Sequence, residues 1–95
     1  MPFDAIRLSD KDNVGVAIHD IAAGGAVELA DIKLTARDPV PLGHKIALRH
    51  IRTGEKILKF GVPVGSATVD IPAGAHVHMH NVKSDYLTNR EDHWE

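Results

Sequence analysis

Residues 40–57 read VPLGHKIALRHIRTGEKI and contain the same seven-residue unit twice. The unit runs apolar-x-x-Gly-x-x-apolar, and a glycine in its fourth place predicts a tight turn with positive φ. The apolar residue at each end would then point into a shared core. Complete copies occupy residues 21–27, 40–46, 51–57 and 71–77, and a weaker copy, VPVGSAT, begins at Val62.

The segments between these turns are short and rich in β-branched residues, which favours strands. No segment keeps a helical period for three turns, and glycines and prolines interrupt wherever a helix could begin. The sequence therefore predicts a compact all-β domain of short strands and many tight turns. The expected strands lie within residues 14–19, 31–36, 45–51, 56–60, 66–71 and 76–82.

Length and composition narrow the class of protein. A chain of 95 residues builds one core, and the absence of cysteine excludes disulfides and thiolate chemistry. The formal charge of −2 comes from scattered acids and bases without a basic stripe, so no nucleic-acid partner is expected. No apolar run approaches the roughly 18 residues of a membrane span, and no leader pattern opens the chain. We expect a cytoplasmic protein.

The domain is expected to span residues 1–85, followed by a polar tail at residues 86–95. The tail is acidic, carries an isolated Trp94 and has no periodicity. It is interpreted as a frayed terminus or as a docking segment. A fold with many corners leaves unpaired strand edges, which an isolated domain must protect or use for pairing. A partner is therefore expected.

Residues 75–83 read AHVHMHNVK, with histidine at every second position. In a continuous strand, alternation places His76, His78 and His80 on one face, opposite Val77. Residues i and i+2 of a strand are about 6.6 Å apart, a distance across which two imidazoles can converge on one ion. Neighbouring imidazoles also disfavour each other's protonation, which keeps them ready to bind metal. The alternative is an exposed polar face without a ligand.

A second candidate lies in GHKIALRHI, where Gly43 is followed at once by His44 and Lys45. His44 could be a turn residue bonded to local backbone, and Lys45 could lie on a solvated edge. Lys59 is a single cation before a turn glycine, and it could serve as the counter-charge of an anionic ligand. The residues alone leave these alternatives open.

Three segments taken together resemble a known family. They are DNVGVAIHDIAAG, PLGHKIALRHIRTGEKILKFGVPVGSATVDIPAG and HVHMHNVK, and they run from about Asp12 to Lys83. In this order they look like the SAF domain of the altronate and galactarate dehydratase family. The resemblance implies a β-clip fold and a lyase that acts on a hydroxy acid. It also implies a divalent metal, with iron(II) as the expected ion.

The same resemblance suggests roles for individual residues. It implies His78, His80 and Asn81 as catalytic contacts, with His78 and His80 as metal ligands. His44, Lys45 and Lys59 become candidate contacts to the carboxylate or hydroxyls of a substrate. A catalytic base on the partner chain is compatible with this assignment.

Three functions follow from the resemblance. The leading hypothesis is the small subunit of a metal-dependent lyase that dehydrates altronate, or a related hexonate, to a 2-keto-3-deoxy acid. It would work with a separate large subunit, and self-association is an open alternative. The other two hypotheses are the small subunit of a sulfolactate sulfo-lyase and a non-catalytic module that binds sugar acids or assembles a complex.

Overall fold

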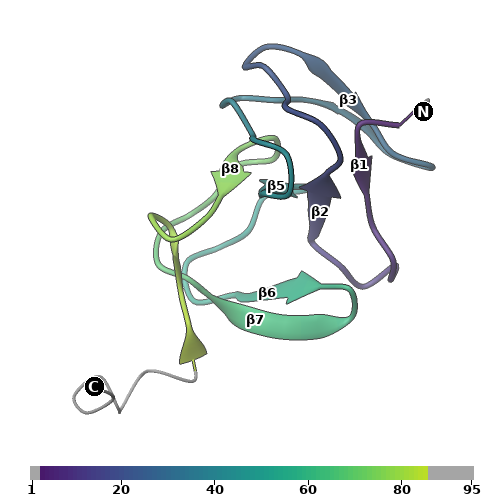
Figure 1. The fold of residues 1–95 in the computed structure, drawn as a ribbon. Helices are drawn as coiled ribbons and strands as arrows, with labels where there is room; N and C mark the ends of the chain where they lie inside the picture. Colours follow the sequence, from purple (N-terminus) through teal and green to yellow (C-terminus); the bar gives the residue numbers. More distant parts are fainter. Residues whose placement is uncertain (1–2, 86–95) are drawn as a thin grey trace.

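The computed structural model describes residues 3–85, which form nine strands and no α-helix (Figure 1). This confirms the all-β prediction; the tail at residues 86–95 lies outside the described range. None of the described residues forms a helix long and apolar enough to cross a membrane. The strands are β1 (Ala5–Ile6), β2 (Val14–Ala17), β3 (Ala26–Glu28), β4 (Lys33–Thr35), β5 (Lys45–Ala47), β6 (Lys56–Lys59), β7 (Val62–Ala67), β8 (His76–Val77) and β9 (Val82–Lys83).

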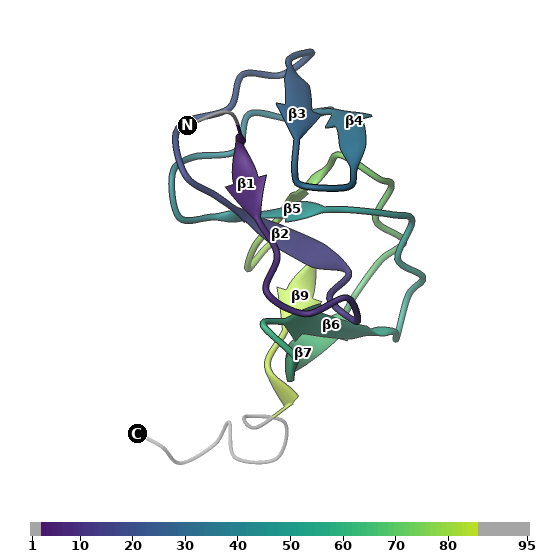
Figure 2. The same cartoon turned by 90° about the vertical axis from the view of Figure 1, so that its right-hand side faces the viewer.

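The strands form three small antiparallel sheets. The largest has the order β1-β2-β5-β8, and the others are β3-β4 and β6-β7-β9. Figures 1 and 2 place the β3–β4 hairpin at one end, the β6–β7 hairpin at the other, and the four-stranded sheet between them. Two isolated bridges, Ile21 with Val40 and Ile51 with Ile71, join the turn units in pairs.

The four complete seven-residue units form the predicted turns. Their glycines have positive φ: Gly24 83°, Gly43 84°, Gly54 86° and Gly74 87°. In each unit the residue after the glycine donates its N–H to a carbonyl three residues earlier, as in His44 to Pro41 at 2.9 Å. A glycine with positive φ in the third place of such a turn is the signature of type II. The apolar ends, all at most 5% exposed, are Ile21, Val27, Val40, Ile46, Ile51, Ile57, Ile71 and Val77.

The weaker copy at Val62 is not a turn, and this part of the prediction is wrong. Gly65 lies inside β7, where a β-carbon would stand 2.4 Å from the Lys83 carbonyl oxygen. This glycine therefore allows the close approach of β9. The turn that closes the β6–β7 hairpin is at Phe60 and Gly61, which have φ of 55° and 80°.

A buried alanine lies four residues before each unit. Its backbone forms hydrogen bonds with the turn of a different unit, and the units are connected in pairs in this way. Its carbonyl accepts the N–H of the turn glycine, and its own N–H donates to the carbonyl of the residue after that glycine. These backbone bonds make units 21–27 and 40–46 mutually supporting, and likewise units 51–57 and 71–77. The glycine bonds are Gly24 to Ala36 (2.8 Å), Gly43 to Ala17 (2.9 Å), Gly54 to Ala67 (2.8 Å) and Gly74 to Ala47 (2.8 Å).

Each pair of units surrounds its own small core, so the single core that the chain length predicted is wrong. One core contains Val40 and Ile46, and the other contains Ile51, Ile71 and Ala47. Strand β5 joins them, because the side chains of its neighbouring residues Ile46 and Ala47 enter different cores, and each residue is 0% exposed. Strand β2 is divided in the same way, with Ala17 in the first core and Val14 in the second, so the domain is two similar halves that share β2 and β5.

The packing beneath the turns predicts the effect of enlarging Ala47. Ala47→Leu adds three carbons at a fully buried site beside the Gly74 turn, and overpacking of this kind lowers the free energy of unfolding by about 1–3 kcal/mol. The matched control is Ala73→Leu, an exposed turn position equivalent to that of Leu42. Urea denaturation of both variants checks the prediction. A change at Ala47 no larger than that at Ala73 would contradict it.

Candidate functional site

Histidines from two turn units meet at the β8 edge of the four-stranded sheet. β5 pairs with β8 so that Ile46 faces His76 and Lys45 faces Val77. His44 directly precedes β5, and His78 directly follows β8. The pairing therefore brings together side chains that are more than thirty residues apart in the sequence.

Three of these rings form a compact group. One ligand atom from each of His44, His76 and His78 lies within 4.8 Å of the other two. The rings of His44 and His78 stack with centroids 4.3 Å apart, and His44 Nδ1 is 2.8 Å from His76 Nε2. The His80 ring is 5.3 Å from that of His76 and does not belong to the three-ligand group.

The expected continuous strand through residues 76–82 is wrong, because β8 ends at Val77. Asn81 causes the change. Its Oδ1 accepts the backbone N–H of His78, and its Nδ2 donates to the carbonyl of His76, both at 2.9 Å. Its own N–H closes a turn onto the His78 carbonyl at 3.1 Å. Met79 consequently points outward at 81% exposure instead of facing the core with Val77.

The backbone of each histidine in the group is held by at least one hydrogen bond. The His44 carbonyl accepts the N–H of Ala17 at 2.9 Å, and the His76 N–H donates to Asp38 Oδ2 at 2.9 Å. Asn81 is 6% exposed, with both side-chain polar atoms bonded to the backbone of the His76–His78 segment. In this structure Asn81 positions the histidines.

Burial and neighbouring charges favour the neutral forms of His76 and His78. The pKa of His76 is lowered first by partial burial, then by the positive charges that His44, His80 and His78 would carry. The pKa of His78 is lowered by the same kinds of effect, with Lys45 among the charges. In the hydrogen bond between His44 and His76, one nitrogen must be an unprotonated acceptor. Neutral imidazoles are the form that binds a metal ion.

The three rings fit a divalent transition metal. Imidazole nitrogen binds such ions at about 2.0–2.1 Å, so two ligands of one tetrahedral ion are about 3.4 Å apart. Donor atoms within 4.8 Å of one another therefore need to close by roughly 1.4 Å at most, a movement within the reach of side-chain rotation. Three protein ligands leave coordination positions open, as in catalytic rather than structural sites. The ion would replace the proton shared by His44 and His76.

The ammonium group of Lys45 lies beside the histidines, and that of Lys59 lies close enough for its charge to act on Lys45. Lys45 and His78 line a pocket of about 210 Å³ with Val64, Met79, Val82 and Ser84. The pKa of Lys45 is lowered first by burial and then by the positive charge of Lys59. The Lys59 Nζ stands 5.5 Å from the centre of the Phe60 ring. Two nearby cations in a partly buried site favour an anion such as a carboxylate.

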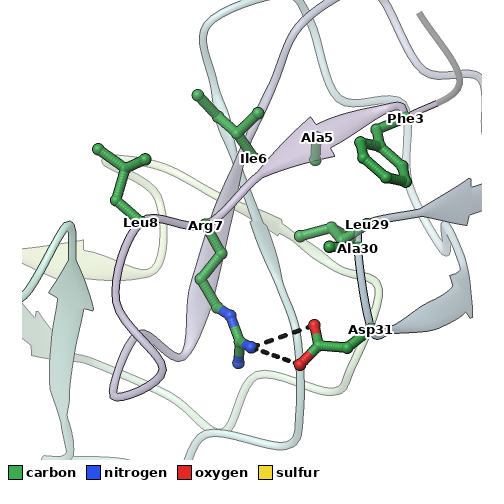
Figure 3. Close-up of a pocket in the computed structure, with 8 residues that line it drawn as sticks. All are labelled: Phe3, Ala5, Ile6, Arg7, Leu8, Leu29, Ala30 and Asp31. Atoms are coloured by element: carbon green, nitrogen blue, oxygen red, sulfur yellow. Dashed lines mark hydrogen bonds and ion pairs between the residues drawn. The ribbon is translucent and has the colours of Figure 1, made fainter.

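A larger pocket, of about 450 Å³, lies along the opposite edge of the same sheet, beside β1 (Figure 3). Its lining is mainly apolar and includes Phe3, Leu8 and Leu29. Arg7 forms a two-contact ion pair there with Asp31, at 3.1 and 2.8 Å. No histidine lines it. The three-histidine group borders the smaller pocket instead, through His78.

The structure brings most of the predicted site residues into one region, but the histidines that form the three-ring group are not the predicted pair of ligands. His44 and His78 belong to the three-ring group, Lys45 lines the pocket with His78, and the charge of Lys59 acts on Lys45. His76 was not among the predicted ligands, although alternation had placed it on the same face as His78. The pairing of β5 with β8 was the missing information.

These features define a candidate class of site: three imidazoles with the geometry to hold a metal ion, and a pair of lysines nearby that would attract an anion. The sequence model of the altronate/galactarate dehydratase SAF domain matches residues 3–85, and the chain belongs to this family. The resemblance seen in the sequence is therefore confirmed.

The curated relatives include altronate dehydratases and sulfolactate sulfo-lyase subunits. The altronate dehydratase of Escherichia coli is 42% identical over 80 residues, which cover 84% of this chain and 16% of that protein. The altronate dehydratase of Bacillus subtilis is 38% identical over the same lengths. The (2R)-sulfolactate sulfo-lyase subunit alpha of Chromohalobacter salexigens is 30% identical over 91 residues, covering 88% of this chain and 97% of that subunit. The chain spans about one sixth of the altronate dehydratases, and these relatives place it in a family of lyases.

The electrostatics of the group can be measured directly. In a proton NMR titration without metal, His76 and His78 should titrate below the ordinary histidine pKa of about 6.5. His19 is an internal contrast, because its ring nitrogens face the Asp20 carbonyl and the Asp4 carboxylate, which raise its pKa. Titration of His76 or His78 above His19 would contradict the electrostatic assignment.

Proposed function

We propose that this chain is the small subunit of a metal-dependent hydroxy-acid lyase in the cytoplasm, with altronate as its substrate. It would work with a separate large subunit to eliminate water and give a 2-keto-3-deoxy acid. The observation that carries the proposal is the grouping of three imidazoles beside two lysines. The 42% identity to an altronate dehydratase supports the choice of substrate.

In this proposal His44, His76 and His78 hold a divalent ion, with iron(II) expected from the family. When bound, the ion would act as a Lewis acid toward the carboxylate and a hydroxyl of the substrate. This set replaces the His78 and His80 pair that the family resemblance implied, because the donor atoms of His44 and His76 lie close to that of His78. His80 remains outside the set and is available to move a proton.

The elimination needs charge stabilisation and two proton movements. A proton leaves the carbon α to the carboxylate, the β-hydroxyl departs with a proton as water, and the resulting enol becomes the keto acid. Lys45 and Lys59 would hold the carboxylate, whose negative charge grows as the α-proton leaves. Asn81 would act by keeping His76 and His78 in place. The large subunit is proposed to supply the base that removes the α-proton.

A sulfo-lyase is the second candidate. One observation favours it: the sulfolactate sulfo-lyase subunit alpha is matched over 97% of its length, so it is close in size to this chain. The chemistry is related, because removal of the same kind of α-proton can be followed by loss of sulfite instead of water. The imidazole and lysine contacts proposed above would suit either substrate, whichever group leaves.

The test begins by capturing the large subunit with an affinity-tagged copy of this chain from the source cells. The purified complex is then assayed with iron(II) on D-altronate and on (2R)-sulfolactate, by formation of 2-keto-3-deoxy acid and of sulfite. We expect turnover of altronate, and we expect His76→Ala to reduce it at least about 100-fold through loss of a ligand. His50→Ala, an exposed histidine outside the group, is the matched control.

The outcomes separate the hypotheses. Sulfite release without altronate turnover would assign the sulfo-lyase function. Unchanged turnover in an intact complex carrying His76→Ala would reject the metal-ligand role. A complex that binds sugar acids but converts neither substrate would indicate a non-catalytic module.

A further inference from the structure

Asp12 is a buried carboxylate far from the histidines in sequence, and it is only 5% exposed. It accepts three backbone N–H groups. Gly61 donates to Oδ1 at 2.7 Å, and Phe60 and Ser9 donate to Oδ2 at 2.9 and 3.3 Å. Two of these donors belong to the turn that closes the β6–β7 hairpin. A single side chain therefore fixes a turn 48 residues away.

The turn needs such support. Phe60 has a φ of 55°, a left-handed conformation that a bulky side chain rarely adopts. It is the one non-glycine residue with positive φ in residues 3–85. Backbone in this region persists only when surrounding contacts hold it there. The two short N–H bonds to Asp12 are contacts of that kind.

Asn13 extends the attachment along the hairpin. Its Nδ2 donates to the Lys56 carbonyl at 2.9 Å, and its Oδ1 accepts the N–H of Leu58 at 2.8 Å. Asn13 is 1% exposed, so these bonds are shielded from water. Together the side chains of residues 12 and 13 hold β6 and its turn against β2.

Lys59 is the residue immediately before the clamped turn. Its ammonium group lies over the Phe60 ring, and its charge acts on Lys45 beside the histidine group. Two like charges repel, so a flexible side chain on a loose turn would move apart from Lys45. A fixed turn keeps the backbone of Lys59 in place against this repulsion.

We propose that Asp12 is a positioning residue that acts through the Phe60–Gly61 turn to hold Lys59 beside Lys45. The use of this cation pair for a substrate carboxylate rests on the proposed function. The placement of Lys59 by Asp12 does not, because it is argued from the hydrogen bonds of Asp12 to the next two residues, Phe60 and Gly61. The two parts can therefore be tested separately.

The first measurement needs only the isolated chain. In wild type, NMR signals of the Lys59 side chain should be shifted upfield by the ring current of Phe60. Asp12→Asn should return them toward the values of a free lysine, because an amide nitrogen cannot accept the N–H groups that the carboxylate binds. Asp70→Asn is the matched control, since Asp70 accepts the N–H of Thr53 in a different turn. Unmoved Lys59 signals in folded Asp12→Asn would overturn the proposal.

The second measurement is a double-mutant cycle in the reconstituted lyase. Asp12→Asn and Lys59→Gln should each raise KM for altronate several-fold with a smaller change in kcat. The double variant should be no worse than Lys59→Gln alone, because Asp12 acts through Lys59. Additive effects would overturn the proposal, since a merely structural role would lower activity independently of Lys59.

The role of Asp12 can still be tested if the variant does not fold or if the complex is inactive. If Asp12→Asn does not fold, Gly61→Ala strains the same turn at a φ of 80° and is measured in its place, with the same expected results. If the complex turns over no hydroxy acid, the proposed function fails, and the Lys59 signals still decide the role of Asp12.

Discussion

The pairing of β5 with β8 is the constraint on which the candidate site depends. Ile46 faces His76 and Lys45 faces Val77, so the two strands place His44 among the histidines that follow residue 75. Ile46 and Val77 are both 0% exposed. A shift of one residue would turn one strand's side chains to the other face and expose an apolar side chain that is now buried. The core therefore fixes the register, and the register fixes the site.

The two-halved construction explains how so small a chain holds this register without disulfides. Each turn glycine donates to an alanine that stands before the paired unit, so every turn is supported by a partner distant in sequence. Ala17 supports the turn that ends at His44, and Ala47 supports the turn before His76. The site thus lies where a turn from each half meets the other, and both halves must fold for the imidazoles to come together.

Some of this structure could be predicted from the sequence, and the reason is local. A glycine at the third position of a type II turn needs positive φ whatever surrounds it, so the four units and their buried apolar ends could be recognised. The alanines before the units are visible in the sequence too, but their role depends on which units pair. The turn predicted for the copy at Val62 was wrong because Gly65 lies in a strand, where its missing side chain allows close contact with the neighbouring strand.

The details of the site depend on long-range contacts and could not be derived from spacing. Alternation assumes an extended chain, whereas the Asn81 side chain bends the segment after Val77 and changes which rings meet. The importance of His76 required knowledge of the β5–β8 pairing. Asp12 fixes a turn 48 residues away, and the sequence around Asp12 does not indicate that its partner is the turn at Phe60. The candidate site thus arises from pairings that only the folded chain displays.

The most direct test of the account is a titration of the isolated chain with Zn²⁺, a diamagnetic stand-in for iron(II), followed through the ring nitrogens of ¹⁵N-labelled histidine. The account predicts that His44, His76 and His78 shift together and saturate at one equivalent, while His19 and His50 stay unchanged. Shifts confined to His78 and His80, or no shift below millimolar Zn²⁺, would contradict it.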